Sequence, residues 1–217
     1  MKNVVIINLS PRKNGTSAML AKMCKEYLLE NEKNVETVDL YSHLEDMGTV
    51  LSLVDKADTI VMSGPCYIDH YPADTIYLLE QMSTHPEILH KQNLYGIIQG
   101  GMPYVHTHES GIRTLELFCQ DCNINYKGAF VMGLGAMLNG QQLDKLINGK
   151  KVKKSYLAFL NNISNGEISP ESLYKNVQIK MPTIVWMYLA KKMNNTINKE
   201  LTEKGIDYLQ PSPYWKM

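Results

Sequence analysis

The fold of this chain is decided by its opening stretch, which reads Val4-Val5-Ile6-Ile7-Asn8-Leu9 and continues Ser10-Pro11-Arg12-Lys13-Asn14-Gly15-Thr16-Ser17. The part up to Leu9 is mostly apolar and rich in β-branched side chains, which predicts a strand buried on both faces. After Gly15 the apolar residues recur at helical spacing. Hydroxyls, a guanidinium and a glycine therefore lie at one strand-to-helix turn. Its unpaired backbone N–H groups and the helix dipole favour an anion such as phosphate.

Other phosphate-binding loops differ from this first turn, residues 10–17, at specific positions. A nucleotide triphosphate loop needs a lysine immediately before its Ser or Thr, whereas Gly15 precedes Thr16 here. The dinucleotide glycine pattern is absent, as are the cysteine of a phosphatase and the acidic residues of a phospho-receiver domain. The turn therefore predicts a phosphomonoester held by hydroxyls and backbone. Ser, Thr and Asn are also ordinary helix caps and turn formers, so a purely structural role stays open.

Composition and charge exclude several classes of function. The 217 residues include 22 Lys plus Arg and 22 Asp plus Glu, so a net charge of zero gives no electrostatic basis for binding nucleic acid or an anionic membrane. No apolar run has the length of a membrane span, and no export signal is recognisable at the N-terminus. Four cysteines without a secretion signal predict reduced thiols. We therefore expect a cytoplasmic protein with neither nucleic-acid nor membrane partners.

Strand patterns alternate with helix patterns along most of the chain. Strands are expected at residues 3–9, 35–40, 58–63, 94–99 and 126–132, and helices at 15–31, 49–56, 72–82, 107–120 and 140–162. Such alternation predicts right-handed crossovers and a parallel sheet with helices on both faces. The predicted fold class is α/β, with a five-stranded sheet of order 2-1-3-4-5 whose ligand site lies at the carboxyl ends of the strands.

The pattern changes after Ile168, and we divide the chain into a domain at 1–165 and a C-terminal helical extension at 166–217. A helix that starts near residue 169 is interrupted at Met181-Pro182, and a second helix is expected over 183–201. An aromatic tail closes the chain. We expect this extension to pack on the domain or on a second subunit.

Two further turns follow the third and fourth expected strands. The second turn, residues 63–73, contains Gly64, which lets a flat ligand approach the backbone, and Tyr67, which could cover a ring. The third turn, residues 99–104, begins with a glycine pair that permits close approach of a heterocycle. Each turn alone also fits an ordinary surface loop. Because the carboxyl ends of parallel strands meet at one edge, we expect the three turns to form one crevice.

Together the three turns resemble the flavodoxin-like NAD(P)H-dependent FMN reductases and quinone reductases. The resemblance covers residues 1–165 and rests on Ser10-Pro-Arg-x-x-Gly-Thr-Ser, on Pro65-x-Tyr67 with Pro72-Ala73, and on Gly100-Gly101. It implies a flavodoxin-like domain that binds FMN and uses NADH or NADPH as co-substrate. Two positions depart from the family pattern, because Leu9 stands where Gly is usual and Thr16 where Asn is common.

The resemblance also implies which residues form the site. The first turn would hold the FMN phosphate, and the second and third turns would hold the isoalloxazine. The implied cofactor-binding residues are Ser10, Arg12, Asn14, Thr16 and Ser17 in the first turn, Pro65, Cys66, Tyr67 and Ile68 in the second, and Gln99, Gly100 and Gly101 in the third. Tyr104 and His106 are expected to act in catalysis by donating protons or hydrogen bonds to the acceptor, although surface positions would suit them equally well.

The implied function is an oxidoreductase in which NAD(P)H delivers hydride to flavin N5 and a quinone, nitro, azo or similar small acceptor is then reduced. Because the family usually forms homodimers, a homodimer is expected. Two alternatives stay open. One is a flavodoxin-type electron carrier, which the zero net charge disfavours, and the other is a scaffold that has lost the cofactor.

Histidine and cysteine spacings do not predict a metal site. His106-x-His108 lacks further ligands to complete a set. Cys119-x-x-Cys122 has the spacing of a redox or metal pair, but it lies at the end of an expected helix and not at the start, where a thiol pKa falls. Packing and turn roles are therefore favoured for these cysteines, and no metal is expected.

Overall fold

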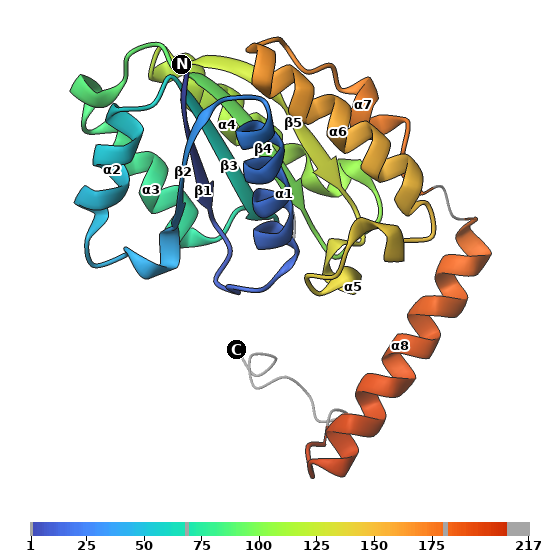
Figure 1. Ribbon diagram of the computed structural model, residues 1–217. Coiled ribbons are helices and arrows are strands. Elements are labelled where there is room, and N and C mark those ends of the chain that lie inside the picture. The colour runs from blue at the N-terminus through green and yellow to red at the C-terminus, as the bar shows by residue number, and fades with distance from the viewer. Residues whose placement is uncertain (1, 68–69, 180–181, 208–217) are drawn as a thin grey trace. The chain divides into compact units, whose positions relative to one another are not determined.

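The structure is a computed structural model that describes residues 2–67, 70–179 and 182–207. Contacts between residues divide the chain into two compact units, Met1–Ile179 and Lys180–Met217. We call the first unit the sheet domain and the second the C-terminal unit. The sheet domain contains every strand of the described chain and all of its buried apolar core (Figure 1).

The sheet has five parallel strands in the order β2-β1-β3-β4-β5, which confirms the predicted topology and fold class. Each strand overlaps its predicted range. The bounds are β1 Asn3–Asn8, β2 Asn34–Asp39, β3 Thr59–Pro65, β4 Asn93–Gln99 and β5 Asn125–Met132. β3 is buried along its whole length, as a central strand covered by helices on both faces must be.

Helices cover both faces of this sheet. Figure 1 shows α1 and α6 in front of the strands and α4 behind them. The principal helices are α1 Thr16–Glu30, α2 Met47–Asp55, α3 Ala73–Ser83, α4 Glu109–Asp121 and α6 Gly149–Asn165, with single turns at α5 Gly135–Leu138 and α7 Ser172–Lys175. Short 3-10 turns lie at η1 Leu40–Ser42, η2 Pro86–Ile88, η3 Val105–His108 and η4 Leu143–Lys145. α1 buries Leu20, Cys24 and Leu28, one residue per turn, against the sheet.

Two predicted helices differ from the structure. The helix expected over 140–162 begins only at Gly149, because Asn139 and Gly140 have left-handed backbone conformations that no α-helix contains. The helix expected from residue 169 is reduced to Ser172–Lys175. Ser169 instead donates its backbone N–H to the carbonyl of Lys127 at 2.7 Å, so residues 166–179, assigned to the extension from the sequence, lie with the sheet domain.

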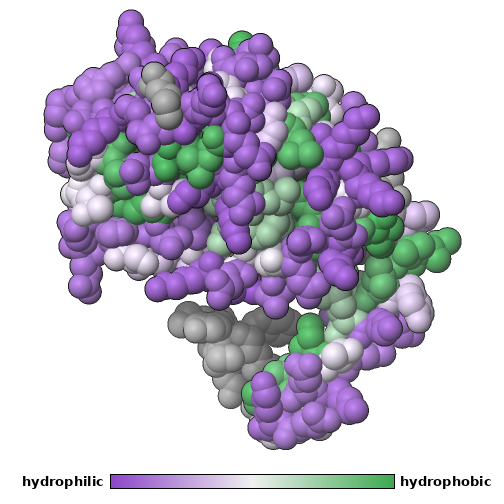
Figure 2. Space-filling view, viewed as in Figure 1, coloured by the Kyte–Doolittle hydropathy of each residue, from purple (hydrophilic) through white to green (hydrophobic). Residues whose placement is uncertain are grey.

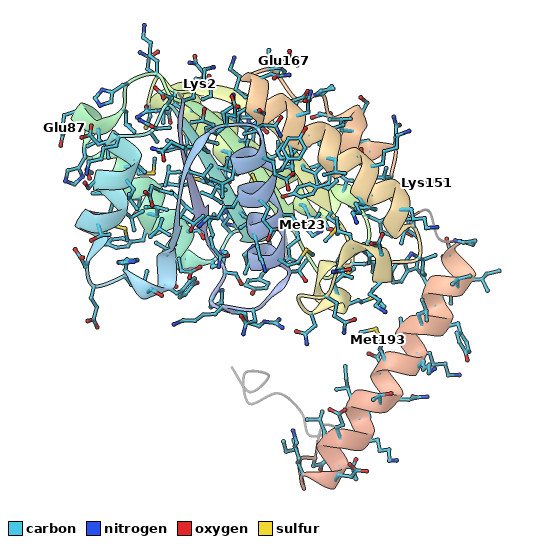
Figure 3. All side chains as sticks on the ribbon, viewed as in Figure 1. Lys2, Met23, Glu87, Lys151, Glu167 and Met193 are labelled. Carbon is cyan, nitrogen blue, oxygen red and sulfur yellow. The ribbon has the colours of Figure 1, made fainter. Side chains whose placement is uncertain are left out.

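The C-terminal unit consists mainly of α8, Thr183–Glu203, which has no buried residue. Apolar side chains remain exposed along it, with Ile184 at 80% and Met187 at 68% of their full exposure (Figure 2). Met193 extends from the same helix (Figure 3). The aromatic tail at residues 211–215 lies outside the described residues. Within the part of the chain that is described, no helix combines the length and the apolar character needed to cross a membrane.

Candidate functional site

The strand register brings the three predicted turns to one edge of the sheet. Gln99 at the end of β4 is aligned with Pro65 of β3 on one side and with Met132 of β5 on the other. Backbone hydrogen bonds continue past the strands, because the Cys66 N–H donates to the Gln99 carbonyl at 2.9 Å and the Gly100 N–H to the Met132 carbonyl at 3.2 Å. The turns therefore begin side by side, on the lower edge in Figure 1.

A cleft at this edge is lined by residues from the three turns and from a fourth segment. Of the residues predicted to bind the cofactor, it is lined by Ser10, Arg12, Thr16, Tyr67, Gln99, Gly100 and Gly101. Gly15, Ala136 and Asn139 complete the lining. The last two belong to the loop at residues 133–140, after β5, which the sequence analysis did not include in the site. The three glycines at 133, 135 and 140 were the signal that could have identified it.

The first turn presents an uncompensated positive helix end. The Gly15 N–H donates to the Arg12 carbonyl at 3.2 Å, and the Arg12 N–H donates to the Ser10 Oγ at 3.2 Å, which closes the turn before α1. α1 has no side-chain cap and no acidic residue in its first turn. The first N–H groups of a helix lack partners within the helix, so this end of α1 favours an anion. The side chain of Arg12, exposed beside it, adds a positive charge.

Thr16 and Ser17 use their hydroxyls inside the protein. Thr16 Oγ1 donates to the Gly135 carbonyl at 2.7 Å and accepts from the Gly140 N–H at 3.2 Å. Ser17 is fully buried, and its Oγ accepts from the Gln99 Nε2 at 3.2 Å. The resemblance assigns both hydroxyls to the phosphate, whereas in this structure they hold neighbouring loops in place.

Gln99 lines the cleft, and its side-chain oxygen, Oε1, is buried against Gly135. The residue is 8% exposed, and no group among the described residues hydrogen-bonds to its Oε1. A buried polar atom left unpaired costs about 1–3 kcal/mol. A ligand N–H donor in the cleft would satisfy this atom if the Gln99 side chain turned away from Gly135.

Two of the glycines predicted to admit a ligand instead make room for protein side chains. A Cβ at Gly64 would lie 2.8 Å from the Cβ of Leu9, so Gly64 accommodates the leucine found where the family usually has glycine. A Cβ at Gly100 would lie 2.0 Å from Cε1 of the buried His108. Gly101, by contrast, has room for a Cβ, whose nearest neighbour would be the Cβ of Ala136 at 3.7 Å.

Three other predicted cofactor residues, Asn14, Pro65 and Cys66, do not line the cleft. Asn14 lies in a separate groove of about 700 Å³ beside α1, together with Met23 (Figure 3). Pro65 is buried at the end of β3, and the buried thiol of Cys66 faces α4. Ile68 lies outside the described residues.

The two residues predicted to be catalytic contact each other. The rings of Tyr104 and His106 stack with their centroids 5.4 Å apart at the beginning of η3, and neither residue lines the cleft.

Tyr41, which the sequence analysis did not single out, lies near Tyr67 of the second turn. Burial and the adjacent Asp74 carboxylate raise the pKa of Tyr41 to about 12, so its hydroxyl is protonated at neutral pH.

The cysteine pair lies apart from the cleft lining. Burial raises the pKa of Cys119 to about 12, and burial likewise raises the pKa of Cys122. Within residues 2–67, 70–179 and 182–207, no group of three or more His, Cys, Asp or Glu side chains is arranged to hold a metal ion.

The five-stranded parallel sheet of order 2-1-3-4-5, with a cleft at its carboxyl edge, defines a flavodoxin-like protein. A sequence model of the NADPH-dependent FMN reductase family matches residues 2–141, and the chain belongs to this family. It is accordingly an NAD(P)H-dependent FMN oxidoreductase, with FMN as its cofactor. A search of curated proteins found no match.

Solved structures share the fold at low sequence identity. A flavone reductase superposes with a TM-score of 0.62 at 13% identity, covering 76% of this chain and 62% of its own, so the chain spans less than two thirds of that protein. An NADH:FMN oxidoreductase in its apo form gives 0.60 at 14% identity, covering 80% of this chain and 94% of its own. An NADPH-quinone reductase from P. pentosaceus gives 0.55 at 15%, covering 76% and 98%. At such identities these likenesses show the fold alone.

Proposed function

We propose that the cleft at the carboxyl edge of the sheet binds FMN and that the enzyme uses NAD(P)H to reduce a small quinone-like or other conjugated acceptor. The observation that carries the proposal is that an uncapped helix N-terminus and an unpaired amide oxygen belong to residues of the same cleft. The first turn of α1 has no acidic residue and no side-chain cap, and Gln99 Oε1 has no donor among the described residues. FMN carries a phosphate at one end and a ring with an N–H donor at the other, so one molecule fits both.

Each residue of the cleft has a distinct task in this proposal. Ser10 and Arg12 bind the phosphate together with the backbone N–H groups of α1. Gln99 accepts a hydrogen bond from the ring, and Tyr67, which is 47% exposed, covers it from the second turn. When bound, FMN supplies the redox chemistry, and the protein supplies position and electrostatics. Tyr104 and His106 remain candidates for contact with the acceptor, which their place after the third turn supports.

The test of the site compares the only two arginines of the chain. Arg12→Ala removes the charge at the first turn, whereas Arg113→Ala removes an exposed arginine from α4 and serves as the matched control. We expect Arg12→Ala to weaken FMN binding about tenfold, measured by quenching of flavin fluorescence on titration of the apo-protein. We expect Arg113→Ala to bind like the wild type. Equal affinities of all three proteins would show that the phosphate lies elsewhere.

The acceptor class is proposed from two fold neighbours, whose names, flavone reductase and NADPH-quinone reductase, refer to conjugated carbonyl compounds. Steady-state assays with NADH and NADPH against quinone, nitro and azo compounds test it. The highest kcat/KM is expected with a quinone, and a preference for azo or nitro compounds would replace this proposal.

We also propose a cytoplasmic location, because all four cysteines are free thiols.

A homodimer is also proposed, and the exposed apolar residues of α8 support it. Ile184 and Met187 expose apolar surface that is usually covered in a soluble protein. Light scattering coupled to gel filtration should give twice the chain mass for the full-length protein. The double variant Ile184→Lys with Met187→Lys should give the monomer mass. A wild-type protein that is monomeric at micromolar concentration would refute the proposal.

A further inference from the structure

The loop at residues 133–140, which the sequence analysis left out of the site, packs against both the first and the third turns. A Cβ at Gly133 would lie 2.3 Å from the carbonyl oxygen of Pro103, and one at Gly140 would lie 2.1 Å from that of Asn14. Neither distance is possible for a residue with a side chain unless the backbone shifts. The loop therefore lies against these turns at a distance that only glycine allows.

Hydrogen bonds fix the loop in this position. The Gly135 N–H donates to the Gly100 carbonyl at 2.8 Å, and Thr16 Oγ1 bonds to both Gly135 and Gly140. The loop also contains left-handed backbone at Leu134, with φ of 59°, a conformation that is unfavourable for a leucine. Such a conformation persists only where the surroundings determine it, as these hydrogen bonds do.

Asn139 is the residue of this loop whose side chain reaches the first turn. Its φ of 45° is left-handed, a conformation that asparagine tolerates better than most residues. Its Oδ1 lies 3.5 Å from Nη1 of Arg12, and both residues line the cleft. A guanidinium has five N–H donors, so the contact with Asn139 leaves others for a phosphate. A carboxylate at this position would neutralise the positive charge of Arg12 and compete with the phosphate. The neutral amide of Asn139 orients the arginine without this effect.

We propose that Asn139 positions the Arg12 guanidinium for the FMN phosphate, which makes the loop after β5 a fourth element of the cofactor site. The inference rests on the proposed function, because it needs the phosphate to lie at the first turn. Asn139 acts through Arg12 and is a positioning residue. Its effect is therefore expected on the phosphate end of the cofactor and not on the ring.

The test compares FMN with riboflavin, which has the same ring and lacks the phosphate. Asn139→Gly removes the amide and keeps the left-handed backbone accessible. Asn123→Gly is the matched control, because Asn123 is an exposed asparagine with φ of 54° in the connection between α4 and β5. We expect Asn139→Gly to weaken FMN binding about five- to tenfold, with riboflavin binding unchanged. Asn123→Gly should change neither affinity.

Two results would overturn the inference. An equal loss of FMN and riboflavin binding in Asn139→Gly would mean that the loop merely supports the fold, and an unchanged FMN affinity would mean that Arg12 needs no positioning. Arg12→Ala, measured beside it, separates this failure from that of the proposed function. If Arg12→Ala loses FMN selectively and Asn139→Gly does not, only the role of Asn139 fails. If neither variant discriminates between FMN and riboflavin, or if the wild type binds neither flavin, both proposals fail.

Discussion

Gly100 is predicted to be intolerant of even one added methyl group, whereas its neighbour Gly101 is not. A Cβ at Gly100 would lie 2.0 Å from Cε1 and 2.7 Å from Nε2 of His108, a residue that is only 2% exposed. Overpacking of this kind costs about 1–3 kcal/mol. The reduced freedom of the unfolded chain offsets about 0.4–1 kcal/mol of that cost. We therefore expect Gly100→Ala to lower the free energy of unfolding by about 1–2 kcal/mol.

Urea denaturation of the FMN-free protein measures this effect, because bound cofactor would itself raise the apparent stability. Gly101→Ala is the control, since its Cβ would make only an ordinary contact at 3.7 Å from Ala136. Its free energy of unfolding should equal or slightly exceed that of the wild type. His108→Ala removes the ring that causes the clash. In the His108→Ala protein, adding Gly100→Ala should lower the free energy of unfolding no more than Gly101→Ala does in the wild type. If Gly100→Ala is as destabilising in the His108→Ala protein as in the wild type, the clash with His108 is not the cause.

Three further predictions concern groups held by burial or by hydrogen bonds. Thr16→Val should lower the free energy of unfolding by about 1–3 kcal/mol in urea denaturation, because it leaves the buried Gly135 carbonyl without its donor, whereas Thr16→Ser should retain most of the stability. Tyr95→Phe should cost about 1 kcal/mol by the same measurement, because the Tyr95 hydroxyl donates to the Glu167 carbonyl at 2.7 Å. The pKa of Cys119 is raised to about 12, so its thiol stays protonated at pH 8. A thiol reagent should therefore modify Cys119 slowly in the native protein and rapidly in guanidinium. Rapid modification of the native protein would contradict the burial of this residue.

The element order was predictable because each strand and helix carries its own local pattern. The apolar run before Ser10 and the helical spacing after Gly15 identify β1 and α1 without any tertiary contact. The helix expected over 140–162 failed at its start for a related reason. Residues 140–148 have a composition compatible with a helix, but Gly140 packs against Asn14 with left-handed backbone and Gly149 packs against Leu143.

The site was predictable only in part, because sequence patterns identify residue types and not the direction in which side chains point. Arg12, Tyr67 and Gln99 line the cleft as expected. Cys66, predicted from the same turn as Tyr67, points the other way and packs near Gly111 of α4. Successive side chains of extended backbone alternate between two faces, and the sequence does not tell which face a turn will expose.

The sequence by itself determined the flavodoxin-like order of strands and helices, the turn between β1 and α1, and the membership of the FMN reductase family. Only the tertiary structure decided which hydroxyls face the cleft and that the loop after β5 belongs to it. The physical reason is the separation of the contacting groups along the chain. Ser17 and Gln99 are 82 residues apart, and Thr16 and Gly135 are 119 apart. Local patterns cannot encode such pairs, which form only when the parallel strands bring their carboxyl ends to one edge.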